Sequence, residues 1–335
     1  MIIFYCIQLI VRQNKIIYVG NMNRFIKQSK GFLGKQLNKV NMILQVIRLG
    51  RHRFANLLNL RKKDGKLICR NDFIFKFNKK NAKQIKDLFY FSLLDGVLFS
   101  NRKGYWNYKN NIITTPQGIK FDIKSFDELI FAETFLYDIH FSYFDLKNKV
   151  VVQAGGFTGD TALYYADRGA KVYSFEPDRN SYDLALLNLK LNPKLSKKII
   201  FKNLIIDKDG VIDFPIVESG SGGSSIYDKD KNKMAKIRSV SIETIIKEFR
   251  IKNPYLLDLD IKGSEFNVVN EKILSKFKII RIEYSTKIGD KNLGNRDYII
   301  KKLKQLGFKN IRIYKHNYGS YDLINHGTIE AKSRR

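Results

Sequence analysis

The chain has 335 residues, 44% of them hydrophobic, and its formal net charge is +29 at pH 7. This length is enough to bury a full core, and it predicts either one large domain with an extension or two domains. The two cysteines, Cys6 and Cys69, form no metal-binding pattern, and so few thiols favour a reducing, cytoplasmic setting. The apolar segment 1–11 is too short to span a bilayer and has no basic residues before it, which argues against a signal peptide.

The basic excess is concentrated in the first 120 residues, which hold 24 Lys or Arg and only 4 Asp or Glu. Between Leu33 and Ile47, apolar residues recur at steps of three and four with basic residues among them, which predicts a basic amphipathic helix. Residues 22–50 could therefore contact the inner membrane surface, bind a nucleic-acid backbone, or pack their apolar stripe on the chain's own core. Of the two ligands, the membrane is favoured over nucleic acid.

Residues 61–120 have the pattern of a small α+β region. A strand is predicted at 73–77, a helix at 82–94 and a pair of short strands between 105 and 123. The aromatic side chains from Phe99 to Tyr108 could stack on sugars or bases, or form one face of a half-buried hairpin. We interpret residues 1–120 as a basic N-terminal extension.

From residue 145 onward, predicted strands and helices alternate. The strands are expected at 150–154, 171–175, 199–205, 255–259, 279–283, 311–314 and 328–331, and the helices at 161–167, 182–191, 242–249, 265–273 and 297–306. Such alternation predicts a mostly parallel sheet that is covered on both faces and binds its ligand at the carboxyl ends of the strands. Residues 121–335 are therefore predicted to form an α/β domain of the Rossmann-like class.

The most informative segment is 151–176, which combines a strand, a glycine turn, a helix, a second strand and a terminal acid. In such a unit the glycines let the backbone approach a nucleoside, the helix amino end offers N–H groups, and Glu176 can accept hydrogen bonds from ribose hydroxyls. The glycines do not have the Gly-x-Gly-x-x-Gly spacing of dinucleotide sites. They match the looser Gly-x-x-x-Gly turn of S-adenosylmethionine sites, although a tight turn without a ligand would have the same pattern.

Three carboxylates lie at predicted strand ends: Glu176, Asp260 and Glu283. Asp260 precedes a turn into a helix at the expected ligand edge, where an acceptor hydroxyl would lie. Methyl transfer from a sulfonium is an in-line displacement, and alignment of the two reactants can contribute about 7 to 11 kcal/mol. A single acid that accepts the hydroxyl proton is then sufficient. The alternative is that Asp260 caps the following helix.

Four motifs in this order resemble the FkbM-type family of class I S-adenosylmethionine-dependent methyltransferases: VVQAGGFTGDT at 151–161, VYSFEP at 172–177, LDLDIKGSEF at 257–266 and IEY at 282–284. The likeness extends over residues 112–332. It implies a seven-stranded, mostly parallel sheet with a reversed last strand, and O-methylation, often of sugar hydroxyls in glycoconjugates or natural products.

The resemblance also implies a cofactor and a set of site residues. The cofactor is S-adenosylmethionine, its expected contacts are Gln153, Gly155, Gly156, Gly159, Asp160 and Glu176, and the expected catalytic residue is Asp260. No metal-binding residues are predicted. The expected acceptor is a small molecule or glycan.

This chain departs from the family pattern at several motif positions. Gln153 replaces a usual Asp, Phe157 a common Asn, Asp258 a common Lys, and Lys262 a common Glu. Gln153 can still accept a hydrogen bond but cannot pair ionically with the amino group of the cofactor. Ser285 follows the IEY motif where relatives often have His, and the chain's own histidines are scattered, which favours structural roles for them.

Two other functions remain open at this point. Asp258 and Asp260 form an Asp-x-Asp pair, which is typical of metal-dependent nucleotide-sugar transferases. Alternatively, the basic first third could make the chain a nonenzymatic membrane or nucleic-acid adaptor. The Ser/Gly segment 219–225 is predicted to be either a mobile loop over the site or a flexible connection.

Overall fold

A computed structural model describes residues 52–69, 73–98, 106–136, 144–215, 234–288, 290–314 and 323–333. The predicted basic helix within 22–50, the Ser/Gly segment 219–225 and His140 lie outside the described residues. The chain forms two compact units. The described residues up to Gly118 belong to the first with those of 126–136, and Ile119–Ser125 belong to the second with the described residues from Phe144 onward. The predicted domain boundary at residue 120 stays a prediction, because the compactness of a unit does not show that it folds independently.

The first unit contains two hairpins and several helices. Its elements are α4 (Arg53–Asn59), β1 (Gly65–Ile68), β2 (Ile74–Phe77), α5 (Ala82–Leu98), β3 (Asn107–Lys109), β4 (Ile112–Thr114), α6 (Glu128–Phe131) and the π-helical turn η3 (Ala132–Leu136). The pairs β1–β2 and β3–β4 are antiparallel. The predicted strand at 73–77 and helix at 82–94 are confirmed, whereas α4 and β1 were not predicted.

Aromatic side chains form the core of this unit. Phe75 lies 6.0 Å from Phe89 and 6.4 Å from Tyr108, measured between ring centroids. Trp106 is buried against Phe135 at 5.9 Å. Because Trp106 and Tyr108 are both buried, the structure favours their assignment to a hairpin face over a ligand-stacking role.

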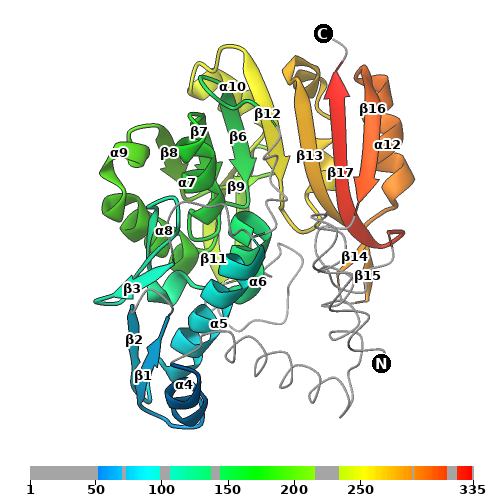
Figure 1. Ribbon diagram of the computed structural model, residues 1–335. Coiled ribbons are helices and arrows are strands. Elements are labelled where there is room, and N and C mark those ends of the chain that lie inside the picture. The colour runs from blue at the N-terminus through cyan, green and yellow to red at the C-terminus, as the bar shows by residue number, and fades with distance from the viewer. Residues whose placement is uncertain are drawn as a thin grey trace. The chain divides into compact units, whose positions relative to one another are not determined.

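The second unit is built around a seven-stranded sheet, which Figure 1 shows with its strands side by side. Their order is β16 (Phe308–Tyr314), β17 (His326–Ser333), β13 (Ile279–Ser285), β12 (Pro254–Leu259), β6 (Val150–Ala154), β7 (Lys171–Phe175) and β8 (Ile199–Lys202). Strands β13, β12, β6, β7 and β8 are parallel, and β17 runs antiparallel to both of its neighbours. The predicted Rossmann-like fold, mostly parallel with a reversed last strand, is confirmed.

Helices and smaller strands complete this unit. They are β5 (Lys120–Asp122), η2 (Ile123–Ser125), α7 (Asp160–Asp167), α8 (Arg179–Leu191), α9 (Pro193–Ser196), β9 (Ile205–Ile206), β10 (Gly210–Pro215), β11 (Met234–Val240), α10 (Ile242–Glu248), α11 (Glu265–Val268), η4 (Lys272–Lys276), β14 (Lys287–Ile288), β15 (Lys291–Asn292) and α12 (Arg296–Gln305). Three helices begin at side-chain caps, because Asp178, Ser241 and Asn295 each accept a hydrogen bond from a backbone N–H three residues later. No helix in the described part of the chain is both long and apolar enough to cross a membrane.

The structure differs from the sequence-based prediction at two elements. The predicted strand 199–205 is divided into β8 and β9, because the Asn203 side chain donates to the carbonyl oxygens of Glu176 and Pro177 and turns the chain. The predicted helix 265–273 ends at Val268. The chain then turns at Glu271, whose carboxylate accepts from two N–H groups at the start of α10, and continues as the 3₁₀ helix η4.

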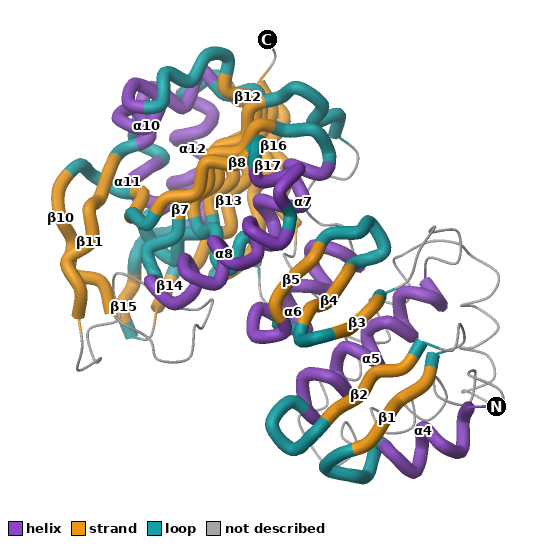
Figure 2. The backbone as a smooth tube through the Cα atoms, turned by 90° about the vertical axis from the view of Figure 1, so that its left-hand side faces the viewer, coloured by secondary structure: helices purple, strands orange, loops and turns teal. Residues whose placement is uncertain are grey.

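The two faces of the sheet differ in chemistry. One face is apolar and packs against α10, α12 and the segment from Phe266 to Phe277. Figure 2 shows α7 and α10 on opposite sides of the sheet. On the face that α7 covers, five buried polar side chains lie in register on neighbouring strands: Ser174, Gln153, Asp258, Arg281 and Glu330.

The centre of this polar row is a buried ion pair. The Asp258 carboxylate lies 2.5 Å from the Arg281 guanidinium and accepts a hydrogen bond of 2.8 Å from the Tyr165 hydroxyl of α7. Burial alone lowers the pKa of Arg281, but the charge of Asp258 raises it well above the usual range. The row therefore attaches α7 to the middle of the sheet through a hydrogen bond to a charged acceptor, in addition to the buried apolar side chains of the helix.

Asp258→Ala should lower the free energy of unfolding by about 3–5 kcal/mol, because it leaves the Arg281 charge buried without its counter-ion. Urea unfolding followed by circular dichroism measures this. The control is Asp183→Ala, which removes an exposed ion pair with Arg179 and should cost at most about 1 kcal/mol. Equal losses of stability in Asp258→Ala and Asp183→Ala would contradict a buried ion pair. The double variant D258L/R281M replaces both charges by apolar side chains, and it should recover much of the stability that Asp258→Ala loses.

Candidate active site

The predicted site residues converge on the carboxyl edge of the sheet. Strand register aligns Phe175, Ala154, Leu259 and Ile282 on four neighbouring strands. The next residue on each strand is, in the same order, Glu176, Gly155, Asp260 and Glu283. The structure thus brings the predicted cofactor turn, the ribose acid and the predicted catalytic acid to adjacent positions.

The glycine turn after β6 is shaped by very close backbone contacts. Gly155 has a φ of +87°, and a Cβ there would lie 2.0 Å from the carbonyl oxygen of Asp260. A Cβ on Gly156 would lie 2.5 Å from the Ser174 hydroxyl, so it too would overlap its neighbours. Gly159, with a φ of +79°, is the residue before α7. Glycine is therefore required by the protein's own packing at 155 and 156, as well as by any ligand.

Glu176 is held at the end of β7 by the backbone of the turn. One carboxylate oxygen accepts from the N–H of Phe157 and the other from the N–H of Asp178, both at 2.8 Å. Phe157 has a φ of +44°, an unfavourable conformation for a bulky residue, and this directs its N–H toward Glu176. Burial raises the pKa of Glu176 to about 7, although the two backbone hydrogen bonds lower it. Each oxygen keeps a second lone pair for a further donor.

Gln153 and Asp160, the other predicted cofactor contacts, are both buried. Gln153 lies two residues before Gly155, and its side-chain oxygen accepts a hydrogen bond of 2.8 Å from the Ser174 hydroxyl. Asp160 is in the first turn of α7 and accepts from the Thr161 hydroxyl at 3.0 Å. Their contact with a cofactor stays a prediction.

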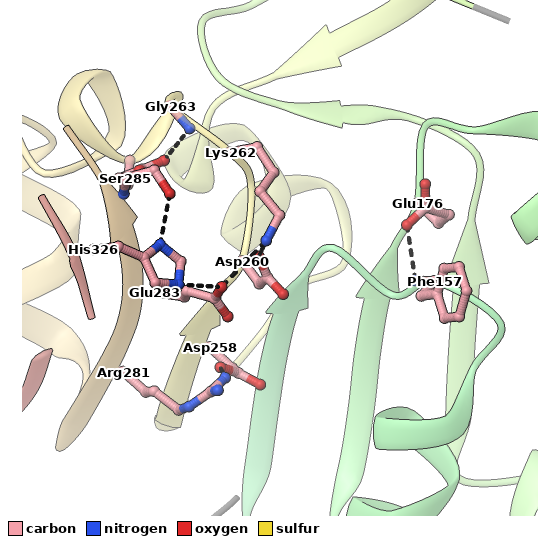
Figure 3. Close-up of polar contacts among 11 residues, drawn as sticks. Phe157, Glu176, Asp258, Asp260, Lys262, Gly263, Arg281, Glu283, Ser285 and His326 are labelled. Carbon is pink, nitrogen blue, oxygen red and sulfur yellow. Dashed lines mark hydrogen bonds and ion pairs between the residues drawn. The ribbon is translucent and has the colours of Figure 1, made fainter. Parts of the chain in front are cut away.

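Asp260 is part of a charged cluster, which Figure 3 shows in close-up. The Lys262 ammonium lies 3.0 Å from the Asp260 carboxylate and 3.2 Å from that of Glu283. Burial alone lowers the pKa of Lys262, but the two carboxylates raise it above the ordinary value. Helix α11 begins only at Glu265, after Ser264, so the alternative that Asp260 caps this helix is wrong.

The cluster continues to a histidine whose role the sequence did not indicate. His326 of β17 lies 3.4 Å from the Glu283 carboxylate through Nε2 and 2.9 Å from the Ser285 hydroxyl through Nδ1. Ser285 and His326 are register partners on neighbouring strands, although 41 positions separate them. In the family resemblance described above, His is common at the position of Ser285. Here the imidazole next to that position belongs to His326 of the neighbouring strand β17.

Glu265 connects the two loops that carry these groups. Its carboxylate accepts from the N–H of Gly263 at 2.5 Å and from the N–H of Ser285 at 3.1 Å. The side chain is fully buried, and burial raises its pKa to about 7 despite these bonds. Lys262 adopts a φ of +45° in the same turn. Glu265 is thus a positioning residue for the Asp260 and Ser285 loops.

Asp258 does not join Asp260. Both of its carboxylate oxygens are used inside the sheet, by Arg281 and Tyr165. In addition, the cation nearest to Asp260 is the ammonium of Lys262. Nothing in this geometry favours a metal-binding Asp-x-Asp pair.

Gly155→Ala should destabilise the protein more than Gly307→Ala. Both glycines have a φ near +90°, but a Cβ on Gly307 would meet no atom within 4 Å. The control therefore isolates the conformational cost of about 1–2 kcal/mol, and overlap with Asp260 should add about 1–3 kcal/mol. Thermal unfolding of the two variants measures the difference. If Gly155→Ala is no less stable than Gly307→Ala, the ends of β6 and β12 can move apart at no cost in stability, which would contradict the close contact.

Comparison with known proteins gives one family match. Residues 150–309 match the family described as "Methyltransferase FkbM domain". The matched range contains Gln153, the glycine turn, Glu176 and the cluster around Asp260. No curated protein matches the chain.

Several solved structures are similar in fold. A methyltransferase FkbM from Methylobacillus flagellatus KT shares 16% identity over 75% of this chain and 60% of its own, with a TM-score of 0.41. Magnesium protoporphyrin IX methyltransferase from Synechocystis PCC 6803, crystallised with bound SAM, shares 13% identity over 56% of this chain and 72% of its own, with a TM-score of 0.33. At TM-scores this low, the assignment to a family rests on the match at 150–309.

Proposed function

Residues 150–309 belong to the FkbM domain family of methyltransferases, and on this premise we propose that the chain transfers a methyl group from S-adenosylmethionine to a hydroxyl of a sugar, glycoconjugate or related metabolite. The observation that carries the proposal is the register of Glu176, Gly155 and Asp260 on three adjacent strands. Glu176, the proposed ribose acceptor, and Asp260, the proposed proton acceptor, then lie on the two sides of one glycine turn, which supports the proposal.

The residues on the β7 side suit the cofactor. Glu176 is buried, has acceptor capacity left on both oxygens and lies beside a turn with no side chain at 155 or 156. These properties match two vicinal ribose hydroxyls, which donate hydrogen bonds to a carboxylate. When bound, the cofactor would supply an electrophilic methyl group on a sulfonium centre.

The residues on the β12 side suit an acceptor hydroxyl. The hydroxyl oxygen forms its new bond to the methyl carbon while the bond between that carbon and sulfur breaks, and the hydroxyl proton passes to Asp260. Asp260 is one-third exposed, whereas Glu283 is buried, so Asp260 is the carboxylate that an acceptor can reach. Lys262 fixes its orientation and favours the ionised form that accepts a proton. The expected acceptor is a small molecule or glycan, and the expected location is the cytoplasm.

Glu176→Gln should weaken the binding of S-adenosylhomocysteine and remove its dependence on pH. In the unmodified protein, ribose hydroxyls should bind the ionised carboxylate, whose pKa is about 7 without ligand. Affinity should therefore rise with pH, by up to about tenfold per unit below pH 7, and level off above it. Isothermal titration calorimetry without added metal measures this. The control, Glu243→Gln at an exposed position of α10, should leave affinity unchanged.

Stability provides an independent check on Glu176. A carboxyl whose pKa is raised by folding stabilises the fold while it is protonated, and this contribution is lost as pH rises from about 4.5 toward about 7. Glu176→Gln should lessen that decline in thermal stability.

Binding of a nucleoside diphosphate that requires metal, with no binding of S-adenosylhomocysteine, would contradict the proposed function and favour a nucleotide-sugar transferase.

Asp260→Asn should slow methyl transfer by about 10²–10⁴-fold and leave S-adenosylhomocysteine affinity nearly unchanged, because it removes only the proton acceptor. Incorporation of labelled methyl from S-adenosylmethionine into cell glycan and glycolipid fractions measures transfer, and mass spectrometry identifies the product. Asp290→Asn, a change at an exposed residue, is the control. Unchanged incorporation with Asp260→Asn would exclude this residue as the base.

A further inference from the structure

The first unit gathers basic side chains at one end of the β1–β2 hairpin. In register, Gly65 pairs with Phe77, so the loop before β1 and the loop after β2 lie at the same end. The Lys86 ammonium of α5 donates to the carbonyl of Lys62 at 2.6 Å, which brings the start of α5 to the loop before β1. The described residues from 61 to 87 include nine cations: Arg61, Lys62, Lys63, Lys66, Lys76, Lys79, Lys80, Lys83 and Lys86. The same residues include two acids, Asp64 and Asp87.

These cations outnumber the acids around them in the described protein, although the charge of Lys83 acts on the Asp87 carboxyl. No carboxylate among the described residues lies within ion-pair distance of any of the nine, and all but Lys86 are exposed. Lys66 and Lys76 lie directly opposite each other on the outer face of the hairpin. Like charges in directly opposed positions destabilise a strand pair. An arrangement that costs stability in the isolated protein is explained if an anionic partner binds over it.

Large apolar side chains are exposed on β2 and on the neighbouring helix α4. Ile74 is on the outer face of the hairpin with Lys76 and is 39% exposed. Helix α4 lies beside β1, as Figure 2 shows, because the Asn56 side chain forms two hydrogen bonds of 2.8 Å with the backbone of Ile68. This helix exposes Phe54 by 66% and Leu58 by 64%.

We propose that these residues form a docking face for an anionic lipid bilayer. The hairpin face, as we call it, consists of the nine cations together with Phe54, Leu58 and Ile74. Cations that attract lipid phosphates, combined with apolar side chains that enter the headgroup region, are the chemistry of peripheral membrane binding. Leu58 and Ile74 argue against a nucleic acid as the partner, because aliphatic side chains neither stack on bases nor contact phosphates. The proposal is independent of the methyl-transfer reaction.

Co-sedimentation of the full chain with vesicles tests the hairpin face. We expect binding to vesicles that contain phosphatidylglycerol and phosphatidylcholine, little binding to phosphatidylcholine alone, and release as salt is raised. The triple variant K66E/K76E/K80E should bind the anionic vesicles at least about 100-fold more weakly, since each lysine contributes roughly fivefold. The control K190E/K194E/K301E makes the same change in net charge at exposed residues of the second unit and should have a much smaller effect. Circular dichroism verifies that both variants fold.

A second pair of measurements separates lipid from other anions. The variant L58S/I74S keeps every charge, so it should lose vesicle binding by about tenfold or more while any binding to single-stranded RNA stays unchanged. The proposal is overturned if the triple variant binds vesicles as the unmodified chain does, or if the full chain binds no anionic vesicle. It is also overturned if RNA binds more tightly than vesicles and L58S/I74S has no effect on either.

Discussion

The two central strands of the sheet end so close together that no side chain fits between Gly155 and the backbone of Asp260. The N–H of Asp260 donates to the carbonyl of Ala154 at 2.9 Å, which keeps the strands paired to their last residues. The site depends on this contact, because it sets the separation between the turn that would hold a cofactor and the acid that would accept a proton. If the chain performs the proposed in-line displacement, the alignment of its two reactants would depend on this backbone packing.

The two halves of the site differ in their electrostatics. Glu176 receives only neutral backbone donors, so burial dominates and raises its pKa to about 7. Asp260 and Glu283 share the ammonium of Lys262, which compensates their charge directly. The first carboxylate has no cation beside it to compensate its charge, while the pair on either side of Lys262 has one. Carboxylates at the ends of two strands on either side of β6 therefore differ in what they could do: Glu176 suits binding in the proposed reaction, and Asp260 suits proton transfer.

Lysine has two distinct roles in this chain. Lys262 is partly buried between two carboxylates, so its charge is used within the protein. The lysines of the hairpin face are exposed, and Lys66 lies opposite another lysine instead of an acid. A general bias of composition toward lysine explains their number but not their concentration on and around one short hairpin. That concentration is the feature that a partner outside the chain would recognise.

The sequence by itself determined the elements of the sheet and the residues at their ends. Strands β6 and β7 were predicted to the residue, since apolar runs bounded by glycine or an acid are local signals. Glu176 followed from the end of β7, and Asp260 from the predicted strand 255–259, which is β12. Only the tertiary structure decided that His326 contacts Ser285 and Glu283, that Asp258 is used inside the sheet, and that Lys66 faces Lys76. Such contacts depend on strand order and register between segments far apart in the chain, and local periodicity carries no information about either.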